Sequence, residues 1–127
     1  MGLDSGITIR KINEKDIPDF IKYTKYGEEI EIAYWRKCWN IRGEILDILN
    51  PENEDKYSFA IDKEDIPAIT RTLKPFLAKD YWDDNNTSIW EYEDMIDNNI
   101  QVIINLIWLY IYMNEHDDIE VEFYDSY

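Results

Sequence analysis

The chain has 127 residues, of which 45% are hydrophobic and 15% are aromatic, and its formal net charge is −15. That apolar content is enough for a buried core, and the aromatic content excludes the disordered class to which strongly acidic chains often belong. Because nucleic acid is itself an anion, the charge also excludes it as a direct ligand, and we predict one acidic globular domain over residues 1–127.

The first 50 residues predict one strand followed by two helices. Residues 7–12 alternate between apolar and polar side chains, as a half-buried strand does. Asp16 and Pro18 predict a helix that starts nearby, with the aspartate as its cap and the proline in its first turn. Residues 28–49 carry apolar side chains three or four apart, which predicts a long helix. This apolar stripe consists of Ile30, Tyr34, Cys38, Ile41, Ile45 and Ile48.

The same pattern, a strand followed by an aspartate and a proline at a helix start, recurs in the middle of the chain. Residues 57–61 again have the pattern of a strand, and Asp65 and Pro67 again stand where a helix would start. The shared stretch is too short to indicate a duplication, so we interpret it as shared capping chemistry.

The last predicted helix, 89–114, contains the most apolar segment of the chain. Ser88 or Thr87 would cap it, with Glu91 three residues after Ser88. After Ile100 the helix is apolar almost all round, so we expect it to be central or shared with a second subunit, as in a homodimer. The apolar run is too short to span a membrane. Its few polar positions fall near one stripe, namely Asn98, Gln101, Asn105 and Tyr112.

The final segment, 118–124, alternates and predicts a strand that is buried on one face. Ile119, Val121 and Phe123 form the apolar face, and Glu120, Glu122 and Tyr124 form the other. The predicted fold class is α+β, a small antiparallel sheet of about three strands packed by about four helices, with the last long helix central.

Catalytic and metal-binding groups are scarce. Cys38 and His116 are the single residues of their kinds, and no glycine-rich phosphate loop is present. Residues 83–94 have oxygen side chains at offsets that resemble a calcium loop, but Ser88 replaces the turn glycine and Asp94 the final glutamate. We therefore predict a non-enzyme without metal or cofactor, and a lone cysteine fits a reducing cytoplasm.

The charge is distributed unevenly along the sequence. Residues 1–79 hold 15 acids and all 13 bases, a balance of −2, whereas residues 80–127 hold 13 acids and no base. Such asymmetry steers cationic partners toward one part of a molecule, with a strength that falls as salt rises.

The predicted long helix over 28–49 also carries aromatic and basic residues beside its apolar stripe. Trp35 and Trp39 lie four residues apart and off the stripe, so they cover a second packing contact or stand exposed as a contact for a partner. Arg36, Lys37 and Arg42 lie nearby and offer the one basic pocket that a nucleotide phosphate would need.

Several segments resemble a family of small uncharacterised bacteriophage and prophage proteins. They are "MGLD", "EIAYWRKCWNIR", "YSFAIDKEDI", "YEDMI" and "FYDSY", in an order that spans most of the chain. Tyr34, Trp35, Arg36, Lys37 and Ile41 match the family pattern. Trp39 and Arg42 stand where the family has asparagine and histidine, so any polar site there is lost or rebuilt. The resemblance implies a phage-borne setting in a bacterial cytoplasm and no activity.

The leading hypothesis combines that setting with the charge. It is a non-enzymatic inhibitor of a bacterial nucleic-acid-handling enzyme, such as a CRISPR effector, whose acidic surface in residues 80–127 imitates phosphates and binds the enzyme's basic surface. The candidate carboxylates are Asp83, Asp84, Glu91, Asp94, Asp117, Asp118, Glu120, Glu122 and Asp125.

Other classes remain open. One is a structural or regulatory binding module with incidental acidity, and another is a nucleotide-sequestering protein that uses Arg36, Lys37 and Arg42. An enzyme has the least support from the residues.

Overall fold

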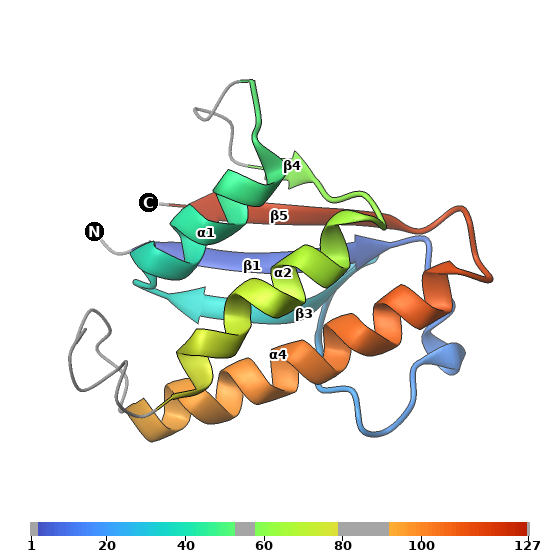
Figure 1. Ribbon diagram of the computed structural model, residues 1–127. Coiled ribbons are helices and arrows are strands. Elements are labelled where there is room, and N and C mark those ends of the chain that lie inside the picture. Colours follow the sequence, from blue (N-terminus) through green and yellow to red (C-terminus); the bar gives the residue numbers. More distant parts are fainter. Residues whose placement is uncertain (1–2, 53–57, 79–91, 127) are drawn as a thin grey trace.

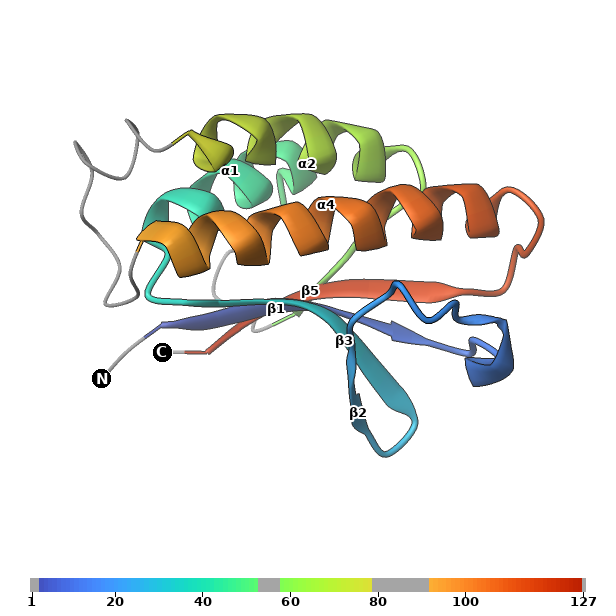
Figure 2. The same cartoon turned by 90° about the horizontal axis from the view of Figure 1, so that it is seen from below.

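Five antiparallel strands form one sheet, and helices cover one of its two faces (Figures 1 and 2). The computed structural model describes residues 3–52, 58–78 and 92–126. The strands are β1 (Asp4–Arg10), β2 (Thr24–Tyr26), β3 (Glu29–Arg36), β4 (Ser58–Ala60) and β5 (Glu120–Ser126), in the order β2-β3-β1-β5-β4. The helices are α1 (Trp39–Leu49), α2 (Asp65–Leu73) and α4 (Tyr92–Met113), with 3₁₀ turns η1 (Glu14–Asp16) and η2 (Lys74–Leu77).

The predicted α+β class is confirmed, but the element count is wrong. Within the described residues the sheet has five strands instead of three, and three α-helices are present instead of four. The last helix is not central, because α2 lies between α1 and α4 in the helical layer (Figure 1). Two segments account for the difference, the predicted helix over 28–49 and the predicted helix at Asp16.

The first half of the predicted long helix is strand β3. Ala33 pairs with Ile7 on β1, but Glu31 pairs with the next residue, Thr8, so Ile32 is an extra residue in the ladder. This β-bulge puts two buried residues, Ile32 and Ala33, side by side in the sequence. The strict alternation of a strand is thereby lost, and the apolar positions acquire spacings of three and four that imitate a helix.

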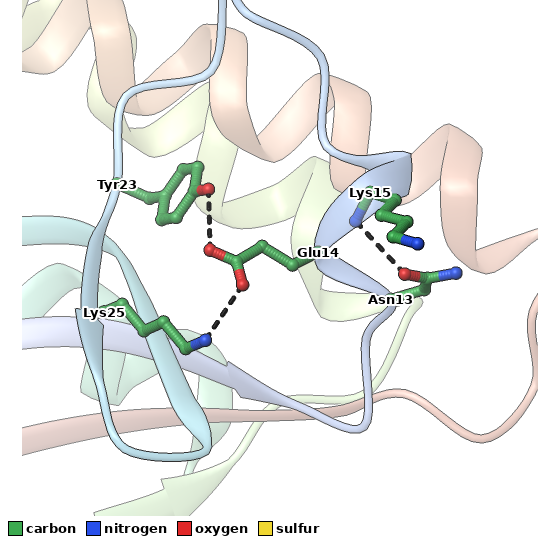
Figure 3. A network of polar contacts seen from close by, with 5 residues as sticks. All are labelled: Asn13, Glu14, Lys15, Tyr23 and Lys25. Atoms are coloured by element: carbon green, nitrogen blue, oxygen red, sulfur yellow. Dashed lines mark hydrogen bonds and ion pairs between the residues drawn. The ribbon is translucent and has the colours of Figure 1, made fainter.

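The segment after β1 forms a short turn and not a helix that starts at Asp16. Asn13 caps η1 through its side chain, and the backbone is extended again directly after this single turn. Glu14 then anchors the turn to the start of β2, because its carboxylate accepts from Tyr23 Oη at 3.1 Å and from Lys25 Nζ at 2.9 Å (Figure 3). These contacts hold the chain close to the sheet, where it enters β2.

The predicted strands at 57–61 and 118–124 are confirmed as β4 and β5, although Tyr57 lies outside the described residues. β5 pairs with β1 on one side and with β4 on the other. Its predicted apolar face is buried, and Phe123 stacks on Phe59 of β4 with 6.5 Å between ring centroids. The predicted helix at Asp65 and Pro67 is confirmed as α2. The predicted caps of the last helix, Thr87 and Ser88, lie outside the described residues.

The polar stripe predicted on the last helix is confirmed, and it ties α4 to the sheet. Asn105 Nδ2 donates to the backbone oxygen of Ile32 in the bulge at 2.8 Å and to that of Lys22 at 2.9 Å. Asn98 Nδ2 donates to Tyr34 O at 2.9 Å, and the amide oxygen of Asn99 accepts from the Trp35 indole at 2.8 Å. Asn98 and Asn105 therefore provide donors for two backbone oxygens of β3, and Asn99 provides an acceptor for the buried Trp35 indole.

Asn105→Leu is expected to lower the free energy of unfolding by about 2 kcal/mol, because two carbonyls near the core lose their donor while the side chain keeps the same branched heavy-atom skeleton. Urea denaturation measures the effect. Gln101→Met is the comparison on the same helix. It removes an exposed bond to Phe20 O and a part-buried bond to Asn105 Oδ1 but keeps both bonds that Asn105 Nδ2 donates, so we expect it to cost less than about 1 kcal/mol. Equal losses in the two variants would contradict this account of the bulge.

The opposite side of α4 is exposed in the single chain, which contradicts the prediction of a central helix but not the alternative of a helix shared with a second subunit. Ile100, Ile104, Ile107 and Ile111 are exposed, whereas Val102, Leu106 and Leu109 pack into the core. Among the described residues, no helix has the length and apolar character to cross a membrane.

Candidate functional site

In the described structure no helix covers the second face of the sheet (Figure 2). This face is polar and hollowed. Because side chains alternate along a strand, the residues that stand between the buried ones in the sequence project from this face. The hollow has a volume of about 490 Å³. Its lining comprises Thr8, Arg10, Tyr26, Glu29, Glu31, Tyr34, Ser58, Glu122, Tyr124, Asp125 and Ser126. We name Asp4, Glu31, Tyr34, Glu122 and Tyr124 the open-face cluster.

Gly6 of β1 lies against the ring of Tyr124, one of the residues that line the hollow. A Cβ atom at this position would lie 2.6 Å from the Tyr124 ring and 2.5 Å from the backbone oxygen of Ala33. The absence of a side chain therefore lets the tyrosine ring lie directly against the β1 backbone. Tyr124 is held over the centre of the sheet, with its hydroxyl directed to β3, where it donates to Glu31.

Glu31 is a partly desolvated carboxylate within the cluster. It is partly buried, and burial raises the pKa of its carboxyl even though the bond from Tyr124 lowers it and the charge of Asp4 raises it further. Tyr34 donates to Asp4 at 2.8 Å, and burial together with that bond raises the pKa of Tyr34 to about 12. Burial and the bond to Glu31 likewise raise the pKa of Tyr124, so both tyrosines are neutral hydrogen-bond donors near pH 7.

Most bases near the sheet are already paired. Arg10 Nε donates to Glu29 at 2.8 Å, and Arg42 pairs with Asp125. Lys11 binds Glu120 at 2.8 Å and Lys25 binds Glu14 at 2.9 Å, which lowers the pKa of both carboxyls through the charged hydrogen bonds. Within residues 3–52, 58–78 and 92–126, by contrast, the carboxylates of Asp4, Glu31 and Glu122 form no ion pair.

Glu31→Gln is expected to raise stability at pH 7, because the folded state no longer holds a desolvated charge. A carboxyl with a raised folded-state pKa contributes stability when protonated and loses it as pH rises through that pKa. The advantage of the variant should therefore shrink as pH falls from 7 toward 4, which chemical denaturation at both pH values measures. A variant that is equally stabilising at both would show that the charge of Glu31 is not the cause.

The predicted carboxylates that lie within the described residues differ in how available they are to a partner. Glu120 and Glu122 project from the same face of β5, as predicted, but Glu120 is bound to Lys11. Asp125 lies on the buried face, 1% exposed, and pairs with Arg42, so it is not available to a partner. The remaining described acids, Asp94, Asp117 and Asp118, are exposed on α4 and in the turn before β5. The predicted residues Asp83, Asp84 and Glu91 lie outside the described residues.

The tryptophan and arginine residues do not assemble into a nucleotide pocket in the described structure. Trp35 is fully buried, whereas Trp39 is 48% exposed at the start of α1. The Arg42 guanidinium lies 5.8 Å from the centroid of the Trp39 ring and also pairs with buried Asp125, so it has a structural role. Arg36 is exposed at the end of β3, and Lys37 follows in a turn with a φ of 56°.

The two other candidate reactive residues, Cys38 and His116, lie in separate parts of the structure. Cys38 is buried, as predicted, with its Sγ donating to Arg36 O at 3.3 Å. The His116 ring stacks on Tyr112 with centroids 3.8 Å apart. Over the part of the chain that the structure describes, no group of three or more His, Cys, Asp or Glu side chains is arranged to hold a metal ion.

Sequence reasoning missed most of the open-face cluster, because Glu31 and Tyr34 were placed on a helix. The available signal was the run "EIEI" at 29–32, whose strict alternation indicates a strand with Glu29 and Glu31 on one face.

No family model, no curated protein sequence and no solved structure matches this chain. The similarity to small phage proteins therefore stays a prediction.

Proposed function

We propose that this protein is a non-enzymatic binding protein whose open-face cluster binds lysine or arginine side chains on the basic surface of a nucleic-acid-handling protein. The observation that carries the proposal is the position of the Glu31 carboxylate: it lines the hollow, is partly buried, accepts a hydrogen bond from Tyr124 and forms no ion pair within the described residues. Burial also raises its pKa. A charge held in this way costs stability unless a cation from a partner compensates it.

The surroundings of Glu31 suit a cationic side chain. Glu122 and Asp4 add negative charge, and the hollow is also lined by Tyr34 and Tyr124, a residue type whose ring attracts guanidinium and ammonium groups. These residues project from the paired strands β1, β3 and β5, so the partner meets an arrangement that needs little further ordering. Such a site binds cations and needs no catalytic group.

The class of partner follows from the charge. The net charge of −15 favours association with basic surfaces and disfavours direct binding of nucleic acid. Proteins that handle nucleic acid present such surfaces, and a protein bound there excludes the polyanion. The narrower proposal of a phage-borne inhibitor of a bacterial defence enzyme, such as a CRISPR effector in the host cytoplasm, rests on the sequence resemblance alone.

A nucleotide-sequestering function has less support. It requires Arg42 to reach a phosphate, whereas this arginine pairs with Asp125 on the buried face of the sheet. A binding module that uses exposed Trp39 instead of the open face is the other alternative, and the variants argued in the Discussion distinguish it.

The direct test identifies the partner by affinity capture from bacterial lysate and then measures competition with the purified partner. Increasing concentrations of this protein should displace labelled DNA or RNA from the partner, and the affinity should fall steeply between low and high salt. A ternary complex in which nucleic acid and this protein bind together without competition would contradict the proposal.

A further inference from the structure

Four exposed isoleucines form a straight stripe on α4, on the side of the helix that faces away from the core. Ile100, Ile104, Ile107 and Ile111 are between 38% and 59% exposed. Their spacing of four, three and four residues keeps them on one line of an α-helix over about 16 Å. Surface helices of soluble proteins usually carry polar residues on the side that faces solvent. An apolar stripe in this place is therefore a candidate contact surface, and the described residues leave it uncovered.

The charges around the stripe distinguish between possible occupants. Helix α4 contains no lysine or arginine, and it has no charged residue between Asp97 and its last residue, Met113. Exposed acids stand at both ends of the stripe, namely Asp94 and Asp97 before it and Glu115, Asp117 and Asp118 after it. One base contacts the far end, where Lys63 Nζ donates to Asn114 at 2.9 Å. The stripe is thus an uncharged line with negative charge at each end.

A second copy of this chain fits that pattern poorly. In an antiparallel pair, Asp94 and Asp97 of one copy would lie near Glu115 and Asp117 of the other, and in a parallel pair each acidic end would lie beside itself. Like charges disfavour both arrangements. A complementary partner carries an apolar stripe of its own with lysine or arginine at both ends.

We propose that the isoleucine stripe of α4 binds an amphipathic helix of another protein whose apolar face is flanked by basic residues at both ends. Asp97 and Glu115 are 18 positions apart, so the basic groups of the partner helix should be separated by about 27 Å along its axis. The contact is a helix-on-helix packing selected by charge at its ends. It uses the helical layer, not the open-face cluster, and does not depend on the function proposed for that cluster.

The probe is a labelled helical peptide with leucines at the same three-four spacing and lysines at both ends, 18 residues apart. A matched peptide has glutamates in place of the lysines. Fluorescence anisotropy at low salt should show the lysine peptide binding at least about tenfold more tightly than the glutamate peptide. Ile104→Gln with Ile107→Gln should weaken it by at least tenfold. Trp39→Gln, a change at a comparably exposed apolar residue on α1, which α2 separates from α4, should leave it unaltered.

Circular dichroism checks that the variants fold, and the outer pair, Ile100→Gln with Ile111→Gln, provides a second variant should the first lose its melting transition. Equal affinity for the two peptides, or peptide binding that the isoleucine variants leave unchanged, would overturn the proposal. Light scattering that finds a dimer of the wild-type chain, dissociated by the isoleucine variants, would overturn it as well and assign the stripe to a second copy.

Discussion

Phe123→Ala is expected to lower the free energy of unfolding by about 3–5 kcal/mol, which approaches the whole stability of many small domains. Phe123 is fully buried on β5, and its ring stacks on Phe59. Truncation to alanine removes most of the buried area of an aromatic side chain and leaves a cavity under the helices. The loss affects the only strand that joins β4 to the rest of the described sheet. Urea denaturation followed by tryptophan fluorescence measures it.

Glu120→Ala is the matched control, because it removes a side chain from the same strand on the opposite face. Its carboxylate is about half exposed and its ion pair with Lys11 is a surface pair, so we expect a loss below about 1 kcal/mol. A small effect of Phe123→Ala, comparable to that of the control, would show that β5 is not part of the cooperative core. The two variants thus separate the structural face of the strand from its acidic face.

The prediction was correct for β5 and wrong for β3 because the alternation of buried and exposed residues is unbroken in the first strand and interrupted in the second. In β5 every second residue faces the core without interruption, so a period of two is visible in the sequence. In β3 the bulge at Ile32 shifts the alternation by one residue, and no local pattern announces a bulge. The compensating donor, Asn105, lies 73 positions further along the chain, so the interaction that stabilises the bulge is invisible to local reasoning.

The distribution of charge along the sequence also does not predict which acids remain without a base, for a related reason. The segment 80–127 has no base, but β5 pairs with β1, and Lys11 directly follows β1. Glu120 is consequently neutralised by a residue 109 positions earlier, and Asp125 is neutralised by Arg42. The acids that form no ion pair within the described residues include two from the balanced half of the sequence, Asp4 and Glu31. Strand order decides which charges become neighbours, and strand order requires tertiary contacts.

The open-face cluster shows the same limit for the candidate site. Tyr124 donates to Glu31 across the sheet, and the two residues are 93 positions apart. Glu122 was predicted as a contact residue from its strand position, and the structure places it in the hollow. Glu31 and Tyr34 belong to this cluster because β3 pairs with β1, a contact between distant parts of the sequence.

Neutralising Glu31 and Glu122 together, as Glu31→Gln with Glu122→Gln, is expected to weaken binding of the basic partner at least about 30-fold, or about 2 kcal/mol. The amides keep the shape of the hollow and can still accept a hydrogen bond from Tyr124, but they no longer attract a cation. Glutamine at position 31 is also expected to stabilise the fold at pH 7, so lost binding cannot be attributed to unfolding. Calorimetric titration with the captured partner measures the change.

The control must carry the same change in net charge, because a protein with a charge of −15 attracts any basic surface through its overall field. Asp117→Asn with Asp118→Asn meets this requirement, since both residues are exposed in the turn before β5 and outside the hollow. If the cluster is the binding site, this control should weaken binding less than about threefold, and added salt should reduce that difference further. Equal losses in the two double variants would mean that overall charge attracts the partner and that the open face has no special part in binding. Unchanged binding in both would direct attention to exposed Trp39 on α1.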